Sequence, residues 1–246
     1  MNKVLLLFII VFTLFSCDSK NIEQNREYNY PASKVWKHGV YSKYEARDLE
    51  GVFDGLEVDV IYSPEKNDIY VGRVVADTSK NLPLDEWLAM LKVPSKMSYW
   101  VDFKNLSKAN AKQAMLIMDK LSEKYQIKDN LFIESPDVTA LKTVKDKGYF
   151  TMLWVENLYW WKDRTKDDTI KVMNMIRSQI KELQPDAISC EYRMFPLLCD
   201  TFPEQNIHFW DTPKKNTPEN VEFTKKLCEN ESVKVVLVDY DKPIDY

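Results

Sequence analysis

The sequence predicts an α/β protein, a closed (β/α)₈ or TIM barrel, and three observations support this fold class. Eight short apolar runs with the character of β-strands recur along the chain, and segments with helical spacing separate most of them. Eight such alternations over about 210 residues match the count that a barrel needs. An open doubly wound sheet also alternates, but it usually has fewer strands and often a glycine-rich first turn, which is missing here.

Strands are expected at residues 34–40, 55–63, 97–104, 130–135, 149–156, 186–193, 206–212 and 233–240. The connection between the second and third of these runs, residues 64–96, is unusually long. It is expected to contain an extra strand or hairpin around 68–76 and a short helix at 83–91.

Helical spacing extends over residues 110–125, 135–148, 166–183 and 217–230. Asp137 can cap the second of these helices. Thr217 is the expected N-cap of the last one, and Pro218 takes its first helical position.

The first seventeen residues have the features of a secretory signal. Lys3 gives a positive start, residues 4–15 are almost wholly apolar, and Ser16 precedes Cys17. The apolar core is too short to span a bilayer as a mature helix. The ending LFSC is similar to the lipobox of bacterial lipoproteins, in which the cysteine is lipidated and becomes the new N-terminus. An ordinary signal cleaved nearby is the alternative.

Lipidation at Cys17 would anchor the protein to a membrane without a transmembrane helix, because several acyl chains bind stably. We therefore expect a protein of the bacterial cell envelope that faces the periplasm or the cell surface. The expected organisation is a signal peptide at 1–16, a polar tether at 17–33 and one barrel domain at 34–246.

Charge and composition exclude several classes of site. Loss of Lys3 with the signal leaves 33 basic and 38 acidic residues, a net charge of −5, which argues against a nucleic-acid partner. The five glycines form neither a P-loop nor a dinucleotide motif, so charged side chains or a metal would have to bind any phosphate.

The cysteines beyond Cys17 form no C-x-x-C pair; two of them can pair in an oxidising compartment, but buried free thiols are favoured. They are Cys190, Cys199 and Cys228.

Carboxylates gather near the expected strand ends. Glu57 and Asp59 lie two residues apart and therefore share one face of their strand. A strand whose polar face contacts solvent is the alternative to a functional role for this pair. Asp102 and Lys104 repeat this spacing on the next main strand, and His38 ends the first. Because the carboxyl ends of barrel strands meet at one pole, three carboxylates would converge there. They would repel one another without a cation, and hard oxygen ligands select Mg²⁺ or Ca²⁺.

A cation flanked by histidine and lysine suits phosphodiester cleavage, because the metal and lysine stabilise charge while histidine moves protons. Glycoside hydrolysis needs carboxylates on opposite sides of a sugar, and two carboxylates on one strand cannot supply that alone.

The series KHGVYS, GLEVDV, YWVDFK, HFWDT and VVLVDYDKP resembles the glycerophosphodiester phosphodiesterase and phospholipase C-like phosphodiesterase superfamily. The resemblance extends from about residue 34 to 244 and is greatest to the menorin-like branch of that superfamily. The features shared with this branch are Trp36, His38, residues 102–104 and residues 86–88.

The resemblance implies a phospholipase C-like barrel in which His38 is a catalytic acid or base and Lys104 contacts the phosphate. It also implies that one divalent cation, Mg²⁺ or Ca²⁺, is held by Glu57, Asp59 and Asp102. The family has a second histidine after the second strand, whereas this chain has no histidine there. Arg73 lies near that place and is expected to bind substrate, as is Trp210, but a guanidinium cannot act as a general base.

Other polar residues near the strand ends each have two possible roles or none assigned. Glu134 is either an extra ligand or a carboxylate that satisfies a helix N-terminus. His208 is at least as suited to packing as to chemistry, and Glu191 and Arg193 follow on the sixth main strand.

An aromatic loop after the fifth strand is expected to overhang the active-site pole, where it would stack on a sugar or rest on lipid. Packing onto the barrel rim is the alternative. Its aromatic residues are Trp154, Tyr159, Trp160 and Trp161.

The sequence thus predicts a lipid-anchored, metal-dependent hydrolase of a small-molecule or lipid head-group phosphodiester, such as a glycerophosphodiester. The alternative is a catalytically impaired surface lipoprotein that binds an anionic ligand or a glycan on the same barrel. Fold alone does not choose between them.

Overall fold

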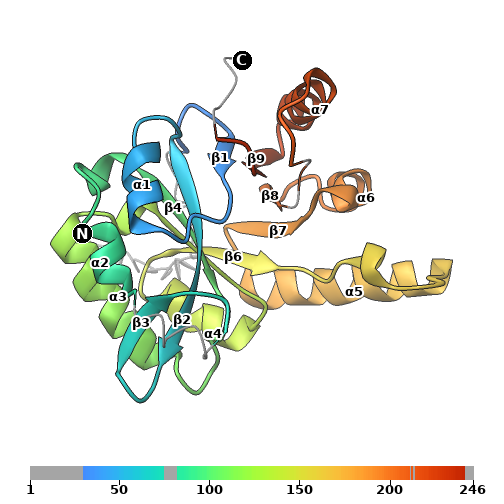
Figure 1. Cartoon of the computed structure of the whole chain (residues 1–246). Helices are drawn as coiled ribbons and strands as arrows, with labels where there is room; N and C mark the ends of the chain where they lie inside the picture. Colours follow the sequence, from blue (N-terminus) through green and yellow to red (C-terminus); the bar gives the residue numbers. More distant parts are fainter. Residues whose placement is uncertain (1–29, 75–81, 211, 213, 242–246) are drawn as a thin grey trace, which may run out of the picture.

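A computed structural model describes residues 30–74, 82–210, 212 and 214–241 (Figure 1). The signal peptide, Cys17 and the tether as far as residue 29 lie outside the described residues. Within the described ranges, no helix combines the length and the apolar character that crossing a membrane requires.

Eight parallel strands close into a barrel, which confirms the predicted fold class. β1 pairs with both β2 and β9, so the sheet has no break between its first and last strands. The barrel strands are β1 (Val35–Lys37), β2 (Gly55–Ser63), β4 (Ser98–Phe103), β5 (Leu131–Ser135), β6 (Phe150–Trp154), β7 (Ala187–Glu191), β8 (Ile207–Trp210) and β9 (Val233–Val238).

Helices surround the barrel strands in Figure 1. The α-helices are α1 (Lys43–Leu49), α2 (Leu84–Leu88), α3 (Ala111–Tyr125), α4 (Val138–Asp146), α5 (Lys166–Leu183), α6 (Phe195–Thr201) and α7 (Pro218–Glu229). Single 3₁₀ turns are formed by Pro94–Lys96, Lys128–Asn130, Leu158–Trp160 and Tyr192–Met194. Both expected caps are confirmed, because Asp137 accepts from the amide of Ala140 at 2.9 Å and Thr217 from that of Asn220 at 3.3 Å.

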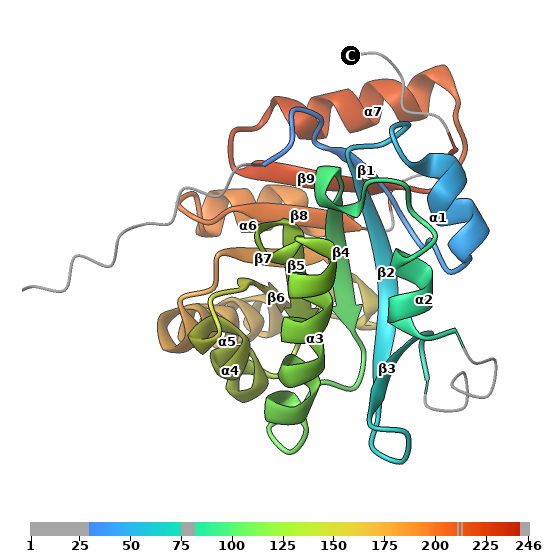
Figure 2. The same cartoon turned by 90° about the vertical axis from the view of Figure 1, so that its left-hand side faces the viewer.

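The additional strand is β3 (Asp68–Val71), which pairs antiparallel with β2 and confirms the expected hairpin. Figure 2 shows this hairpin projecting beyond the neighbouring strands. β3 ends at Val71, and the last two residues of the expected 68–76 segment, residues 75 and 76, lie outside the described residues.

Strand alternation divides the core into two layers. Outward side chains such as Leu56 and Val58 pack between barrel and helices. Inward aromatic side chains, among them Trp36 and Trp100, fill the barrel interior. Gly55 is required here, since a Cβ at this position would overlap the Trp36 indole ring.

The three cysteines of the described chain are free thiols, as favoured from the sequence. Cys190 is buried, and burial raises the pKa of its thiol well above the usual value. Cys199 and Cys228 are half-buried.

Candidate functional site

A cavity of about 450 Å³ lies at the carboxyl ends of the barrel strands. All seven residues predicted for the site line it, namely His38, Glu57, Asp59, Arg73, Asp102, Lys104 and Trp210. The cavity volume falls within the roughly 300–1,000 Å³ range of small-molecule sites. The structure therefore brings the predicted residues together at one place.

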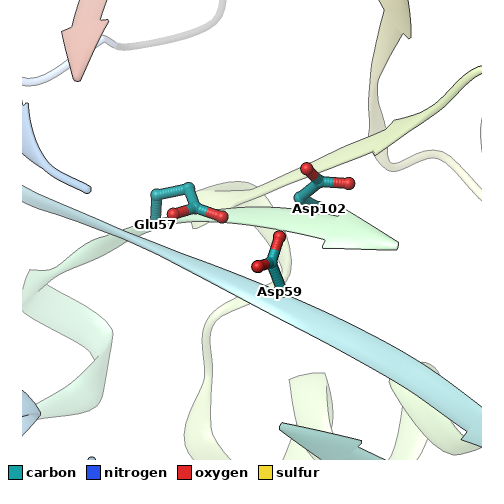
Figure 3. A group of neighbouring side chains, drawn as sticks. All are labelled: Glu57, Asp59 and Asp102. Carbon is teal, nitrogen blue, oxygen red and sulfur yellow. The ribbon is translucent and has the colours of Figure 1, made fainter. Parts of the chain in front are cut away.

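Sheet register sets the positions of the acidic side chains. Asp59 of β2 is paired with Asp102 of β4, and Glu57 lies two residues before Asp59 on the same face. One oxygen from each of the three carboxylates lies within 4.8 Å of the others, and Figure 3 shows the groups turned toward one another. We call these three residues the carboxylate triad.

Positive side chains offset part of the charge of the triad. The Lys104 ammonium is 2.7 Å from Asp59 Oδ1 and also contacts Asp102. Arg73 Nε is 3.1 Å from Asp59 Oδ2, to which the Tyr41 hydroxyl donates a hydrogen bond. Burial lowers the pKa of Lys104, but Asp102 and Asp59 outweigh this effect and raise it above the usual value. Lys104 therefore stays charged.

The triad has the donor set that a hard divalent cation prefers. Burial raises the pKa of Glu57 to about 8; the charge of His38 opposes this rise, and Asp59 adds to it. Burial likewise raises the pKa of Asp102, although the charge of Lys104 opposes it. A cation among these groups would favour their ionised forms, so the residues present fit the predicted metal.

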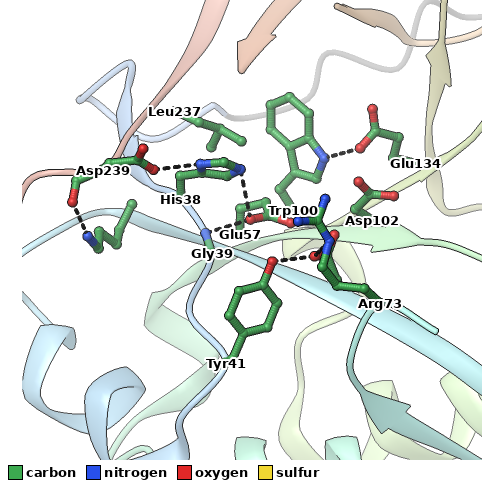
Figure 4. Close-up of polar contacts among 12 residues, drawn as sticks. His38, Gly39, Tyr41, Glu57, Arg73, Trp100, Asp102, Glu134, Leu237 and Asp239 are labelled. Atoms are coloured by element: carbon green, nitrogen blue, oxygen red, sulfur yellow. Dashed lines mark hydrogen bonds and ion pairs between the residues drawn. The ribbon is translucent and has the colours of Figure 1, made fainter. Parts of the chain in front are cut away.

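His38 is held between two carboxylates (Figure 4). Its Nδ1 is 2.7 Å from Asp239 Oδ1, and its Nε2 is 3.8 Å from Glu57 Oε2. Gly39, at φ +69°, donates its amide to Glu57 Oε2 at 2.6 Å. Burial lowers the pKa of His38, but the Asp239 hydrogen bond and the charge of Glu57 raise it overall. The ring is thus oriented, and its protonated form is favoured.

Asp239 was not among the predicted site residues. It directly follows β9, and the backbone carbonyl of Asp239 accepts from Lys37 Nζ at 2.5 Å. The hydrogen bond from His38 lowers the pKa of Asp239 and keeps it ionised. The feature of the sequence that could have indicated Asp239 is its place as a polar residue immediately after an apolar strand.

The second histidine of the chain does not reach the cavity lining. His208 is fully buried among the interior rings, and its Nε2 lies 3.1 Å from the Tyr30 hydroxyl. Burial lowers its pKa to about 3, so it is neutral. Of the two histidines in the chain, both of them described, His38 alone lines the cavity, which Arg73 also lines.

Glu134 also lines the cavity, and of its two expected roles the one at a helix N-terminus is wrong, while a role as an extra ligand stays a prediction. Its oxygens accept from Trp100 Nε1 at 2.6 Å and from the Ser189 hydroxyl, not from a helix N-terminus. Burial raises the pKa of Glu134 well above its usual value. Glu191 and Arg193 do not line the cavity; they pair with each other, with Arg193 Nε 2.7 Å from Glu191 Oε1.

The aromatic loop divides into two groups. Trp154 and Trp160 line the cavity, as expected for a loop over the active-site pole. Trp161 and Tyr159 instead pack against the hydrophobic core, and Trp161 Nε1 donates to Glu156 at 2.9 Å. The loop therefore reaches the active-site pole through Trp154 and Trp160 and packs onto the barrel through Tyr159 and Trp161, while stacking on a sugar or contact with lipid stays a prediction.

No protein-family model and no curated protein matches the sequence. Solved structures are similar to it. A phosphodiesterase from Oleispira antarctica in complex with the product sn-glycerol-3-phosphate matches with a TM-score of 0.61 at 12% identity, over 86% of this chain and 94% of its own. A glycerophosphodiester phosphodiesterase from Parabacteroides distasonis matches with a TM-score of 0.57 at 14% identity, over the same shares of the two chains.

Several of the structural neighbours are described as glycerophosphodiester phosphodiesterases. At these identities the likeness establishes the barrel fold shared with glycerophosphodiester phosphodiesterases, while the menorin-like branch stays a prediction from the sequence motifs.

Proposed function

We propose that this protein is a metal-dependent phosphodiester hydrolase acting on a glycerophosphodiester or a related diester. One observation carries the proposal: the carboxylate triad, Lys104, Arg73 and the His38–Asp239 pair surround one cavity. The glycerophosphodiesterase neighbours support the same chemistry, and one of them was solved with a glycerol phosphate product.

The triad would hold one divalent cation, Mg²⁺ or Ca²⁺, which when bound supplies Lewis-acid stabilisation of the phosphoryl group. Lys104 and Arg73 place two further positive charges beside Asp59, where they can neutralise phosphate oxygens. Arg73 remains protonated, so it binds the phosphate and accepts no proton.

Hydrolysis breaks one P–O bond of the diester and one O–H bond of water; the hydroxyl oxygen bonds to phosphorus, the leaving alcohol takes a proton, and the proton lost by water restores the donor. His38 is placed to donate that proton from Nε2, because Asp239 holds the other ring nitrogen at 2.7 Å. Asp239 acts as a positioning residue that fixes the ring and stabilises its protonated form.

The experiment is a panel of phosphodiester and glycan substrates incubated with and without EDTA. We expect phosphodiester turnover that EDTA abolishes and that is lost in Asp59→Asn. Asp119→Asn is the matched control, since it removes a carboxylate on α3 outside this cavity. Full activity in Asp59→Asn would contradict the proposal, and binding without turnover in the wild type would support the catalytically impaired alternative.

We also propose, from the sequence motifs, that the protein belongs to the menorin-like branch and is tethered to a bacterial membrane through lipidated Cys17. Cys17→Ser is expected to move the protein from the membrane fraction to the soluble fraction. Unchanged membrane association would contradict the lipid anchor.

A further inference from the structure

Three tryptophans form one wall of the cavity. Trp154 ends β6, Trp160 lies in the following 3₁₀ turn, and Trp210 ends β8. The ring centroid of Trp160 is 6.1 Å from that of Trp154 and 5.6 Å from that of Trp210. We call this group the tryptophan wall.

The proposed cleavage chemistry leaves the tryptophan wall without a role. Cation binding and proton transfer involve Glu57, Asp59, Asp102 and His38, whereas Trp160 is a large aromatic side chain that remains 55% exposed. Aromatic side chains that line a cavity are typical of pockets that bind small molecules. Because the wall and the triad line the same cavity, one ligand can reach both.

A charged side chain in the same cavity discriminates between two kinds of occupant. Aromatic faces bind either a quaternary ammonium or the C–H face of a sugar ring. Lys214 also lines the cavity, with its ammonium 3.9 Å from Asp239 Oδ2, and its charge would repel a cationic head group.

Hydrogen bonding also favours a sugar over a quaternary ammonium. Trp210 Nε1 is buried and, among the described residues, has no hydrogen-bond partner. Because neighbouring protein atoms cover this nitrogen, the indole must turn before a ligand oxygen can reach it, and that contact would relieve the cost of the unpaired donor. A sugar offers hydroxyl and ring oxygens as acceptors, whereas a quaternary ammonium offers none.

We propose that the tryptophan wall binds a sugar ring that forms the alcohol part of the substrate, which makes the substrate class sugar phosphodiesters. The sugar stacks on Trp160 and its neighbours while the ester phosphate lies toward the triad. This inference rests on the proposed hydrolase function.

The test compares two diesters that share a methyl ester and differ in the other alcohol, glucose 6-(methyl phosphate) and glycerol 3-(methyl phosphate). The wild type should have the higher kcat/KM for the glucose ester. Trp160→Ala should reduce the glucose-to-glycerol ratio of kcat/KM about tenfold, mainly through KM, and Trp160→Phe should restore most of it. Trp161→Phe is the matched control and should leave the ratio unchanged.

An unchanged ratio in Trp160→Ala would overturn the inference, as would a preference for the corresponding choline ester. If the wild type hydrolyses neither ester, the proposed function fails, and calorimetry still tests the wall. Glucose 6-phosphate should then bind more tightly than glycerol 3-phosphate, and Trp160→Ala should remove the difference. Equal affinities in the wild type would overturn the sugar site independently of catalysis.

Discussion

The barrel interior has an apolar half and a polar half, and each contains one of the two histidines of the chain. The two environments shift the pKa of the histidine in opposite directions. In the apolar half, near the amino ends of the strands, His208 is surrounded by rings such as Phe132 and Phe150. In the polar half, at the carboxyl ends, His38 lies between Asp239 and Glu57. The pKa of His208 is lowered to about 3, whereas that of His38 is raised.

The difference shows that the environment of an inward-facing residue depends on its position along the strand as well as on the face it occupies. On β8, His208 and Trp210 share the inward face, yet the first is fully buried and the second lines the cavity. Residues of the apolar half should therefore determine stability, and those of the polar half should determine turnover.

The largest expected effect is that of His38→Gln, which removes the proton donor of the polar half. We expect kcat to fall about 10²–10⁴-fold, the usual contribution of general acid catalysis. Because the His38 side chain is partly exposed, the melting temperature should change little. Steady-state kinetics and thermal unfolding measure the two quantities, and more than a tenth of wild-type kcat would refute this role.

Asp239→Asn should have a smaller effect, because it leaves the imidazole in place but replaces the carboxylate next to Nδ1 with a neutral amide, which no longer stabilises the protonated ring. We expect kcat to fall about 10–100-fold, as is typical for residues that orient a catalytic group. Asp241→Asn is the control, since it removes only an ion pair from Lys37 to an exposed carboxylate. Equal effects of the two substitutions would show that Asp239 has no positioning role.

The apolar half is tested by the pH dependence of stability. Between pH 3 and about 6.5 the unfolded state protonates His208 and the folded state does not, so stability falls as the pH decreases. Relative to His208→Phe, the wild type should lose about 2 kcal/mol of unfolding free energy between pH 7 and pH 5. The opposite contribution of His38 is present in both proteins and cancels. Urea unfolding measures the difference, and parallel pH profiles would contradict the buried neutral state.

Continuous local patterns predicted much of the fold. β2 at residues 55–63 and α5 at 166–183 coincide with the expected ranges, because alternation or helical spacing persists to both ends. β1 is shorter than expected and ends at Lys37, since Gly39 turns the chain toward Glu57. This turn is a tertiary feature that no local pattern contains.

Short helices were the main omission. α1 and α6 have seven residues each, too few for a helical period to stand out, and packing on the barrel stabilises such helices more than propensity does.

The convergence of Glu57, Asp59 and Asp102 was predictable because parallel strands bring their carboxyl ends to one pole. The contacts of Tyr41 with Asp59 and of Asp239 with His38 were not, because both residues lie in connections whose path depends on the finished barrel. Sequence alternation gives the face of a strand residue, but not its partners across the interior.

The most direct test of the cation site is anomalous diffraction from crystals soaked in Mn²⁺, a stand-in for Mg²⁺ or Ca²⁺. We expect a peak among the oxygens of Glu57, Asp59 and Asp102 that is absent from Asp59→Asn crystals. No peak at saturating Mn²⁺, with Lys104 still paired to Asp59 and Asp102, would contradict the cation site.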